Sequence, residues 1–149
     1  MSGWLQKWRV AVDKALNYLS LARKAGLIEL GEEPVGGATR ALKAKLVVVA
    51  SDSGDHTWRR AKSFVAGTDQ VCVRVPYTKD EMGQATGRTS LAIAAFTDPS
   101  MALAFVKALP QPEKYGEVLE SLAERTKRVQ KRQAEEKAHR KNKQFGKKK

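Results

Sequence analysis

Three glycines between residues 31 and 37 are the first candidates for chemistry, because their spacing resembles that of a phosphate-binding loop. In such a loop a lysine after the second conserved glycine neutralises the outer phosphates, and the next hydroxyl binds magnesium. Here those two positions hold Gly37 and Ala38. The pattern therefore argues against nucleotide hydrolysis. It leaves a glycine-rich turn before a helix, which either binds an anion or only forms a tight turn.

The other reactive side chains do not have the spacing of a catalytic or metal site. The acid pairs 32–33 and 80–81 are adjacent in sequence, which is typical of charges in the first turn of a helix. His56 and His139 are far apart, and neither has a cysteine beside it, so a metal site is not expected. The single Cys72 stands in an alternating apolar segment, which predicts a small buried side chain rather than a reactive thiol. We expect no catalytic residues, no cofactor and no metal.

Three polar loops remain as the candidate site, at residues 31–37, 51–53 and 86–91. Helix N-terminal amides in such loops can contact phosphates or base edges. The planar guanidinium of Arg88 can pair with a phosphate or stack on an unstacked base, as proteins do at RNA bulges and internal loops. If the three loops lie at one end of a sheet, we expect them to hold an RNA backbone together.

A continuous apolar run at residues 46–50 (LVVVA) is typical of a strand that is covered on both faces. Short apolar segments alternate along the chain with helical patterns. The sequence therefore predicts an α/β fold, a three-layer α/β/α sandwich with a short mixed sheet. The expected strands are residues 27–30, 45–50, 71–75 and 91–96, and the expected helices are residues 34–42, 55–66, 78–85 and 99–109.

The N-terminal segment has the periodicity of a helix. Apolar residues recur at spacings of three and four from residue 4 to residue 25, which predicts one amphipathic helix, or two abutting ones, ending at Gly26. We expect Trp4 and Trp8 to pack on the body of the protein. A second interpretation is an exposed stripe in which the two tryptophans bind a partner protein.

Two prolines in residues 110–112 (PQP) mark a boundary, because a helix cannot continue through them. The chain is expected to divide into a helical extension (residues 1–15), an RNA-binding domain (16–110) and a basic tail (111–149). An apolar stripe that begins at Tyr115 predicts that the tail starts as a helix. We expect its highly charged end to fray into disorder when no partner is bound.

The net charge of +12 is concentrated in that tail. Residues 125–149 contain 12 Lys or Arg and two Glu, which leaves the rest of the chain nearly neutral. A cationic tail commonly binds nucleic acid by counterion release. The alternatives are that it only aids solubility or that it binds an anionic membrane, which its scarcity of apolar residues disfavours. The expected phosphate contacts are Arg125, Lys127, Arg128, Lys131, Arg132, Arg140 and Lys141.

Targeting signals are not evident in the sequence. No apolar run is long enough to span a membrane, and charges interrupt the apolar positions near the N-terminus. We therefore expect a cytoplasmic protein.

A set of motifs, in this order, resembles the ribosomal protein L-seven-Ae family, most closely its small bacterial members of the YlxQ-like kind. The resemblance spans residues 16–109. The motifs are residues 19–26 (LSLARKAG), 31–33 (GEE), 44–52 (AKLVVVASD), 79–83 (KDEMG) with Gly87, and 92–94 (AIA) before 97–98 (TD).

The resemblance implies a domain that recognises kink-turn RNA, a sharply bent internal loop beside sheared G·A pairs. The turn at residues 31–33 would approach the G·A bases, and the loop at residues 87–90 would cover the extruded nucleotide. Ser51 and Asp52 would line the same mouth. The residues expected to contact RNA are Gly31, Glu32, Glu33, Gly36, Gly37, Arg40, Lys43, Ser51, Asp52, Gly87, Arg88, Thr89 and Ser90.

Two departures from the family pattern affect this expectation. The family usually carries a lysine one turn into the recognition helix, where this chain has Gly37, and Pro34 and Gly36 also alter the start of that helix. The family often has an apolar residue where Arg88 stands. An electrostatic contact is therefore expected in place of a packing contact.

The sequence thus predicts a non-catalytic, ribosome-associated protein that binds structured, kink-turn-like RNA. The alternative is a protein-interaction or ribosome-docking module that kept the fold, lost specific RNA recognition and uses Trp4 and Trp8 as anchors. A third hypothesis, an enzyme or a substrate-binding fragment of an RNA methyltransferase, lacks any catalytic set of residues.

Overall fold

Helices and short strands alternate along the chain in the computed structural model, which describes residues 13–146. Each predicted strand and body helix is present, with small shifts at the ends. The predicted α/β fold class is confirmed. The elements are α2 (Lys14–Ala25), β1 (Ile28–Leu30), α3 (Glu32–Arg40), β2 (Leu46–Val49), α4 (Asp55–Val65), β3 (Val71–Arg74), α5 (Lys79–Thr86), β4 (Ile93–Phe96), α6 (Pro99–Lys107), the 3-10 helix η1 (Pro112–Tyr115) and α7 (Gly116–Gly146).

The four strands form one short mixed sheet in the order β1-β4-β2-β3. β4 is antiparallel to both of its neighbours, whereas β2 and β3 are parallel. The parallel pair is joined by α4, because parallel strands need a long crossover connection. The predicted mixed sheet is confirmed.

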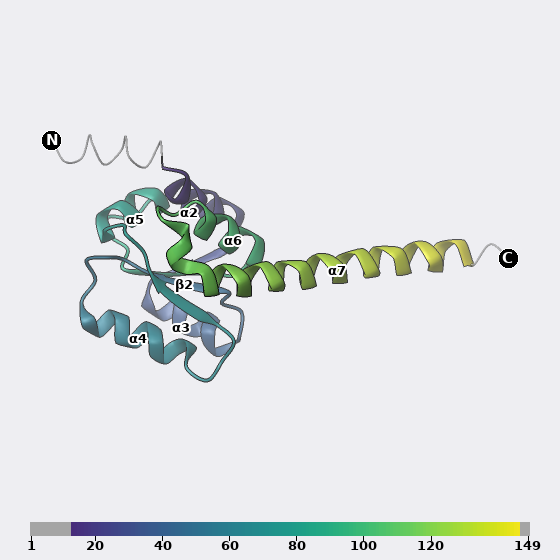
Figure 1. Cartoon of the computed structure of the whole chain (residues 1–149), viewed down its shortest axis with the longest axis horizontal. Helices are drawn as coiled ribbons and strands as arrows, with labels where there is room; N and C mark the ends of the chain where they lie inside the picture. The colour runs from purple at the N-terminus through teal and green to yellow at the C-terminus, as the bar shows by residue number, and fades with distance from the viewer. Residues whose placement is uncertain (1–12, 147–149) are drawn as a thin grey trace.

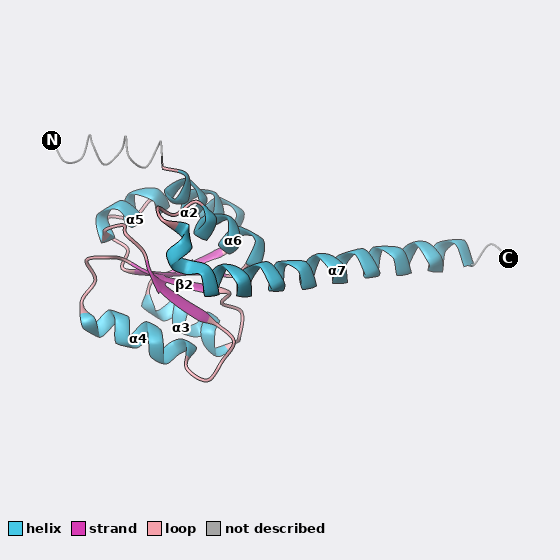
Figure 2. Cartoon of the chain, in the orientation of Figure 1, coloured by secondary structure: helices cyan, strands magenta, loops and turns pink. Residues whose placement is uncertain are grey.

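Helices cover both faces of this sheet, which gives three layers (Figure 1). Figure 2 shows the strands between the two helical layers. α2, α5 and α6 pack on one face together with the start of α7, whereas α3 and α4 pack on the other. In β2, Leu46 and Val48 belong to the first core, and Val47 and Val49 belong to the second. All four side chains are fully buried, as their continuous apolar run predicts.

Helix α2 is the part of the predicted N-terminal helix that the structure describes. Its first turn is capped by the carboxylate of Asp13, and it ends at Gly26 in the left-handed conformation (φ 71°), as predicted. Ala15 is completely buried in the first core. Trp4 and Trp8 lie outside the described residues, so the two interpretations of them stay predictions.

Helix α7 packs on the body only at its beginning. Leu122 is fully buried and Thr126 nearly so, which confirms the apolar stripe expected at the start of the tail. From residue 130 to residue 141 every side chain is exposed, and α7 projects away from the body (Figure 1). The tail is helical as far as Gly146, the last residue that the structure describes. This stretch has no proline and is rich in Ala, Glu, Gln, Lys and Arg, the strongest helix formers.

Candidate nucleic-acid interface

The register of the sheet brings the three candidate loops to one edge. Leu30, the last residue of β1, pairs with Ala94 near the start of β4. Val49, the last residue of β2, pairs with Ile93, the first residue of β4. The helix start that follows β1, the loop that follows β2 and the loop that precedes β4 therefore share this edge, as the sequence predicts. We call it the loop edge, made of residues 31–37, 51–53 and 86–91. Of residues 31–37, however, all but Gly31 lie in α3, which begins at Glu32, two residues earlier than expected.

Gly31 and Arg88 bring two of these loops into contact. Gly31 has a φ of 96°, a conformation that side chains rarely adopt, and its N–H donates to the carbonyl of Ile93 at 3.0 Å. A β-carbon at Gly31 would stand 3.4 Å from Nη1 of Arg88. The missing side chain thus leaves room for the guanidinium beside the start of α3.

The loop after α5 is folded tightly against that helix. The N–H of Arg88 donates to the carbonyl of Gly83 at 2.8 Å. A β-carbon at Gly83 would lie only 2.8 Å from the Arg88 carbonyl oxygen and the Ser90 nitrogen, so only glycine allows this approach. Gly87 makes the turn with a φ of 75°. Arg88, Thr89 and Ser90 are exposed on a loop whose backbone lies against α5.

Ser51 and Asp52 connect the end of β2 to the segment that leads into α5. The backbone N–H of Ser51 donates to the Tyr77 carbonyl at 2.8 Å, and its hydroxyl donates to the same oxygen at 3.2 Å. Oδ1 of Asp52 accepts from the N–H of Lys79 at 2.8 Å. Thr78 and Glu81 form a capping box at the same helix start. Both residues of the mouth are exposed, and their hydrogen bonds fix its shape.

Helix α3 begins with two exposed acids and carries a basic side chain over its middle. Glu32 forms an ion pair with Arg60 of α4, whereas Glu33 is exposed beside it. Gly36 is buried, and a β-carbon there would stand 3.2 Å from the ring of Phe64, so the glycine permits close packing of α3 on α4. The guanidinium of Arg40 folds back over Gly36, with Nη1 also 3.2 Å from that β-carbon position.

The Arg40 guanidinium also reaches Gly37. Its Nη2 lies 4.0 Å from the position of a β-carbon on Gly37, the position at which the resemblance described above implies a lysine. A helical side chain leans toward the N-terminus of its helix, and two glycines in the preceding turn leave space for it. A cation therefore lies next to the position at which the lysine is missing.

Not every predicted contact lies at the loop edge. Lys43 follows α3 in the connection to the start of β2, at the opposite end of the sheet, because α3 runs from one end to the other. Lys43 is therefore not at the loop edge, and its contact with RNA stays a prediction. The tail residues lie on α7, outside the loops that form this edge.

Two arginines near the loop edge were not among the predicted contacts. Arg60 pairs with Glu32, and Nη1 of Arg23 lies 3.3 Å from the position of a β-carbon on Gly87. Arg23 stands in the last turn of α2. It belongs to the LSLARKAG motif, which is the sequence feature that could have indicated it. The pairing of Arg60 joins α3 to α4, and no local pattern in the sequence indicates it.

Among the described residues, no group of three His, Cys, Asp or Glu side chains could hold a metal ion. Burial raises the pKa of the Cys72 thiol, with a smaller opposite effect of Lys62, and burial raises the pKa of Tyr115. Cys72 is half-buried, less than the sequence predicts, and packs against the core between the sheet and α4, whereas Tyr115 packs against the core on the other face.

A comparison with curated proteins identifies the family. Over 76 residues the chain is 32% identical to the RNA-binding protein YlxQ of Enterococcus faecium, a match that covers 51% of this chain and 73% of that protein. The chain belongs to the YlxQ family. The resemblance to the L-seven-Ae family and its YlxQ-like members is thereby confirmed. No protein-family profile matches the chain.

Solved structures share the fold of this YlxQ family member. A protein with unknown function from Bacillus halodurans has a TM-score of 0.60 and 24% identity, covering 64% of this chain and 96% of its own. The Giardia lamblia 15.5kD RNA binding protein has a TM-score of 0.56 and 15% identity, and the match covers 70% of this chain and 87% of that protein. At these identities the likeness is one of fold. Within residues 13–146, none of the helices has the length and apolar character to cross a membrane.

Proposed function

We propose that this YlxQ family member is a non-catalytic protein that binds structured RNA of the kink-turn kind at its loop edge. The contact of Arg88 with Gly31 carries the proposal, because it places an exposed cation beside the start of α3, where the backbone amides of Glu32 and Glu33 lie. The matched Enterococcus faecium protein is itself named an RNA-binding protein, which supports RNA as the partner. We extend the proposal to structured RNA of the ribosome, in the cytoplasm.

The chemistry of the edge suits an irregular RNA loop. Free amides at the start of α3 can donate to phosphates or base edges. The planar guanidinium of Arg88 can stack on an extruded base or pair with a phosphate, and exposed Thr89 and Ser90 offer hydroxyls. RNA is usually read in this way, at unstacked bases rather than within a regular duplex.

Arg40 supplies a positive charge where Gly37 stands in place of the family's lysine. Its guanidinium lies over Gly36 and Gly37, within α3, although its backbone is at the last residue of that helix. An arginine can pair with a phosphate through two parallel hydrogen bonds, which a lysine cannot do. In this proposal the two glycines and Arg40 act together as a substitute for the family's lysine.

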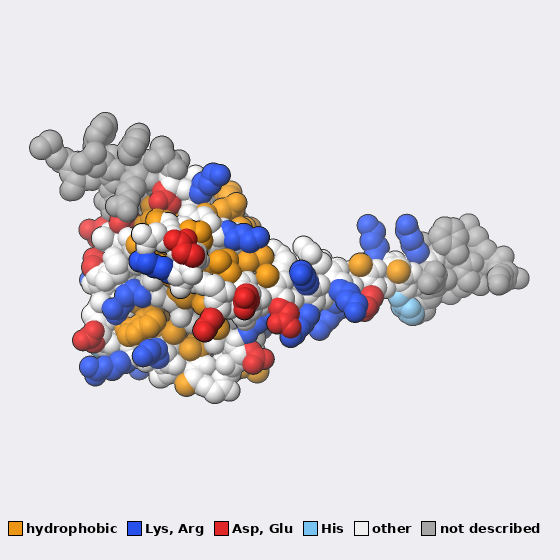
Figure 3. Space-filling model, in the orientation of Figure 1, with side chains coloured by type: hydrophobic (Ala, Val, Ile, Leu, Met, Phe, Trp, Pro, Cys, Tyr) orange, Lys and Arg blue, Asp and Glu red, His pale blue; other side chains and the backbone are white. Residues whose placement is uncertain are grey.

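The exposed part of α7 adds affinity that does not depend on RNA sequence. Basic side chains stand along its length in Figure 3. They include the proposed tail contacts Lys127, Lys131, Arg132, Arg140 and Lys141, all of which are exposed. Cations of this kind release counterions from RNA and give salt-dependent binding.

The test compares two RNAs with the full chain. One is a kink-turn RNA, and the other has the same length but lacks the sheared G·A pairs. Specific recognition predicts that the first binds at least about tenfold more tightly at physiological salt, as expected from the loss of well-placed base contacts. Equal affinities for the two RNAs would overturn kink-turn recognition, and absence of binding to both would overturn RNA binding altogether.

A further inference from the structure

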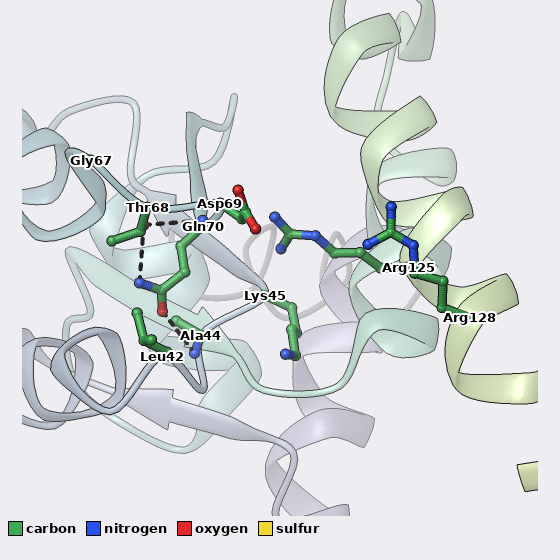
Figure 4. A pocket seen from close by; sticks show the side chains of 9 residues that line it. All are labelled: Leu42, Ala44, Lys45, Gly67, Thr68, Asp69, Gln70, Arg125 and Arg128. Carbon is green, nitrogen blue, oxygen red and sulfur yellow. Dashed lines mark hydrogen bonds between the residues drawn. The ribbon is translucent and has the colours of Figure 1, made fainter. Parts of the chain in front are cut away.

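A cleft lies at the end of the sheet opposite the loop edge. It has a volume of about 440 Å³ and is formed where the segments before β2 and β3 face α7. Figure 4 shows Arg125 and Arg128 of α7 on one side and Lys45 with residues 67–70 on the other. We call it the α7 cleft.

The walls of the α7 cleft are held in place by hydrogen bonds and packing. The side chain of Gln70 accepts from the N–H of Ala44 at 3.1 Å and donates to the carbonyl of Thr39 at 3.1 Å. These bonds tie the two loops of the body together (Figure 4). On the other wall, buried Leu122 and Thr126 anchor the turn of α7 that carries the arginines. The cleft is therefore a built feature rather than a gap beside a free tail.

The charge of the α7 cleft favours an anion. Arg125, Arg128 and Lys45 line it, and Asp69 is the carboxylate among its lining residues. Asp69 and Arg125 point toward one another across the opening (Figure 4). Arg128 also pairs with Glu124 one turn earlier at 2.8 Å, but both side chains are about two-thirds exposed, so water screens this pair. A net positive cleft with two arginines one helical turn apart matches a phosphate group.

The rim of the cleft carries a strained residue. Leu42 has a φ of 58°, at a helix end where glycine is the usual residue, and its side chain is 62% exposed. A leucine in this conformation is unfavourable for folding and gains little from burial here. Strained backbone of this kind is found preferentially at binding sites. An apolar side chain beside a phosphate site can contact a base or a ribose.

We propose that the α7 cleft is a second RNA site, which holds a backbone phosphate between Arg125, Arg128 and Lys45. The identity of the ligand as RNA rests on the proposed function. The strands between the two sites are four residues long, or about 13 Å, so an RNA bound at the loop edge can reach the cleft with an adjoining arm. The two arginines then contact RNA as parts of a formed site, separate from the exposed tail.

The test measures RNA affinity against salt for paired variants of the full chain. Arg125→Ala with Arg128→Ala is compared with Lys107→Ala with Lys114→Ala, which removes the same charge from exposed positions outside both sites. The first pair should weaken binding about tenfold and lower the salt slope by about 0.7 to 0.9 per phosphate lost. The control pair should change both by much less. Equal effects of the two pairs would overturn the proposal.

Substitution of Asp69 distinguishes RNA binding in the α7 cleft from RNA binding by the charged tail alone. Asp69→Asn should tighten binding severalfold, because it removes the carboxylate that lines the cleft and faces Arg125, whereas Glu113→Gln should leave affinity unchanged. Lys45→Ala should weaken binding, with Lys107→Ala as its control. If Asp69→Asn and Lys45→Ala both match their controls while the wild type binds kink-turn RNA, the α7 cleft is not an RNA site and the function at the loop edge stands. A wild type that binds no RNA overturns both.

Discussion

Nη1 of Arg88 lies 3.4 Å from the point at which a β-carbon on Gly31 would stand. The two residues belong to loops that are far apart in sequence and meet because β1 and β4 are antiparallel neighbours. The contact makes one surface of the start of α3 and the loop after α5. A substitution that disrupts this contact should therefore lower both the stability of the fold and the affinity for RNA.

Gly31→Ala should destabilise the fold and weaken RNA binding. An alanine would be strained at a φ of 96°, which costs about 1 to 3 kcal/mol, and its methyl group would crowd Arg88. Gly116→Ala is the control, because Gly116 is helical with nothing near its β-carbon position, and alanine there should stabilise slightly. Urea unfolding and RNA titration measure the two effects. Equal stability of both variants would contradict the strain at Gly31.

Arg40→Ala should weaken kink-turn binding by about 1 to 3 kcal/mol, the usual effect of losing a charged contact to nucleic acid. Gly37→Lys in the same chain should recover most of that loss, since nothing but Arg40 lies within 4 Å of the β-carbon position on Gly37. Affinities of the two single variants and the double variant form a cycle. Additive effects in that cycle would show that Arg40 does not substitute for the lysine.

Gly83→Ala should displace the loop at residues 88–90. The new methyl group would meet two backbone atoms at 2.8 Å, and overpacking of this kind costs about 1 to 3 kcal/mol. RNA affinity should fall with stability, because the displaced loop carries Arg88. A variant of unchanged stability and affinity would mean that this loop is not seated on α5 in solution.

Truncation after residue 129 should flatten the salt dependence of RNA binding without unfolding the body. Residues 130–141 are exposed, whereas Leu122 and Thr126, which anchor α7, remain. The slope of log affinity against log salt should decrease by about 0.7 to 0.9 for each phosphate contact removed. An unchanged slope would show that the end of α7 does not contact RNA.

Cys72 should resist alkylation in the folded protein, and it is the single cysteine of the chain. Burial raises its pKa, so little thiolate is present near neutral pH. The folded state keeps this proton longer than the unfolded state does, so stability should fall as pH rises through the ordinary thiol range. Urea midpoints of the wild type and Cys72→Ala at neutral and alkaline pH isolate the effect. A wild-type midpoint that does not fall relative to Cys72→Ala would contradict it.

Most of the fold could be predicted from the sequence because its signals are local. The run at residues 46–50 indicates a strand buried on both faces, and glycine at position 26 marks the end of α2. The three loops could be grouped because strand ends meet at the edge of a sheet. The end of α7 was predicted to fray, since high charge indicates disorder, yet the same residues are strong helix formers.

The details of the site depend on long-range geometry that local patterns do not contain. The Arg40 side chain lies back along α3 because Gly36 and Gly37 have no side chains to occupy that space. The pairing of Glu32 with Arg60 needs α3 beside α4. Lys43 was among the expected RNA contacts, and the length of α3 carries it to the end of the sheet opposite the loop edge.

Amide hydrogen exchange of the full chain with and without kink-turn RNA tests the proposed interface most directly. Binding at the loop edge predicts slower exchange in peptides that cover residues 31–37 and 86–91, and a much smaller effect with RNA that lacks the G·A pairs. Protection confined to α7, or equal protection by both RNAs, would contradict recognition of RNA by the loop edge.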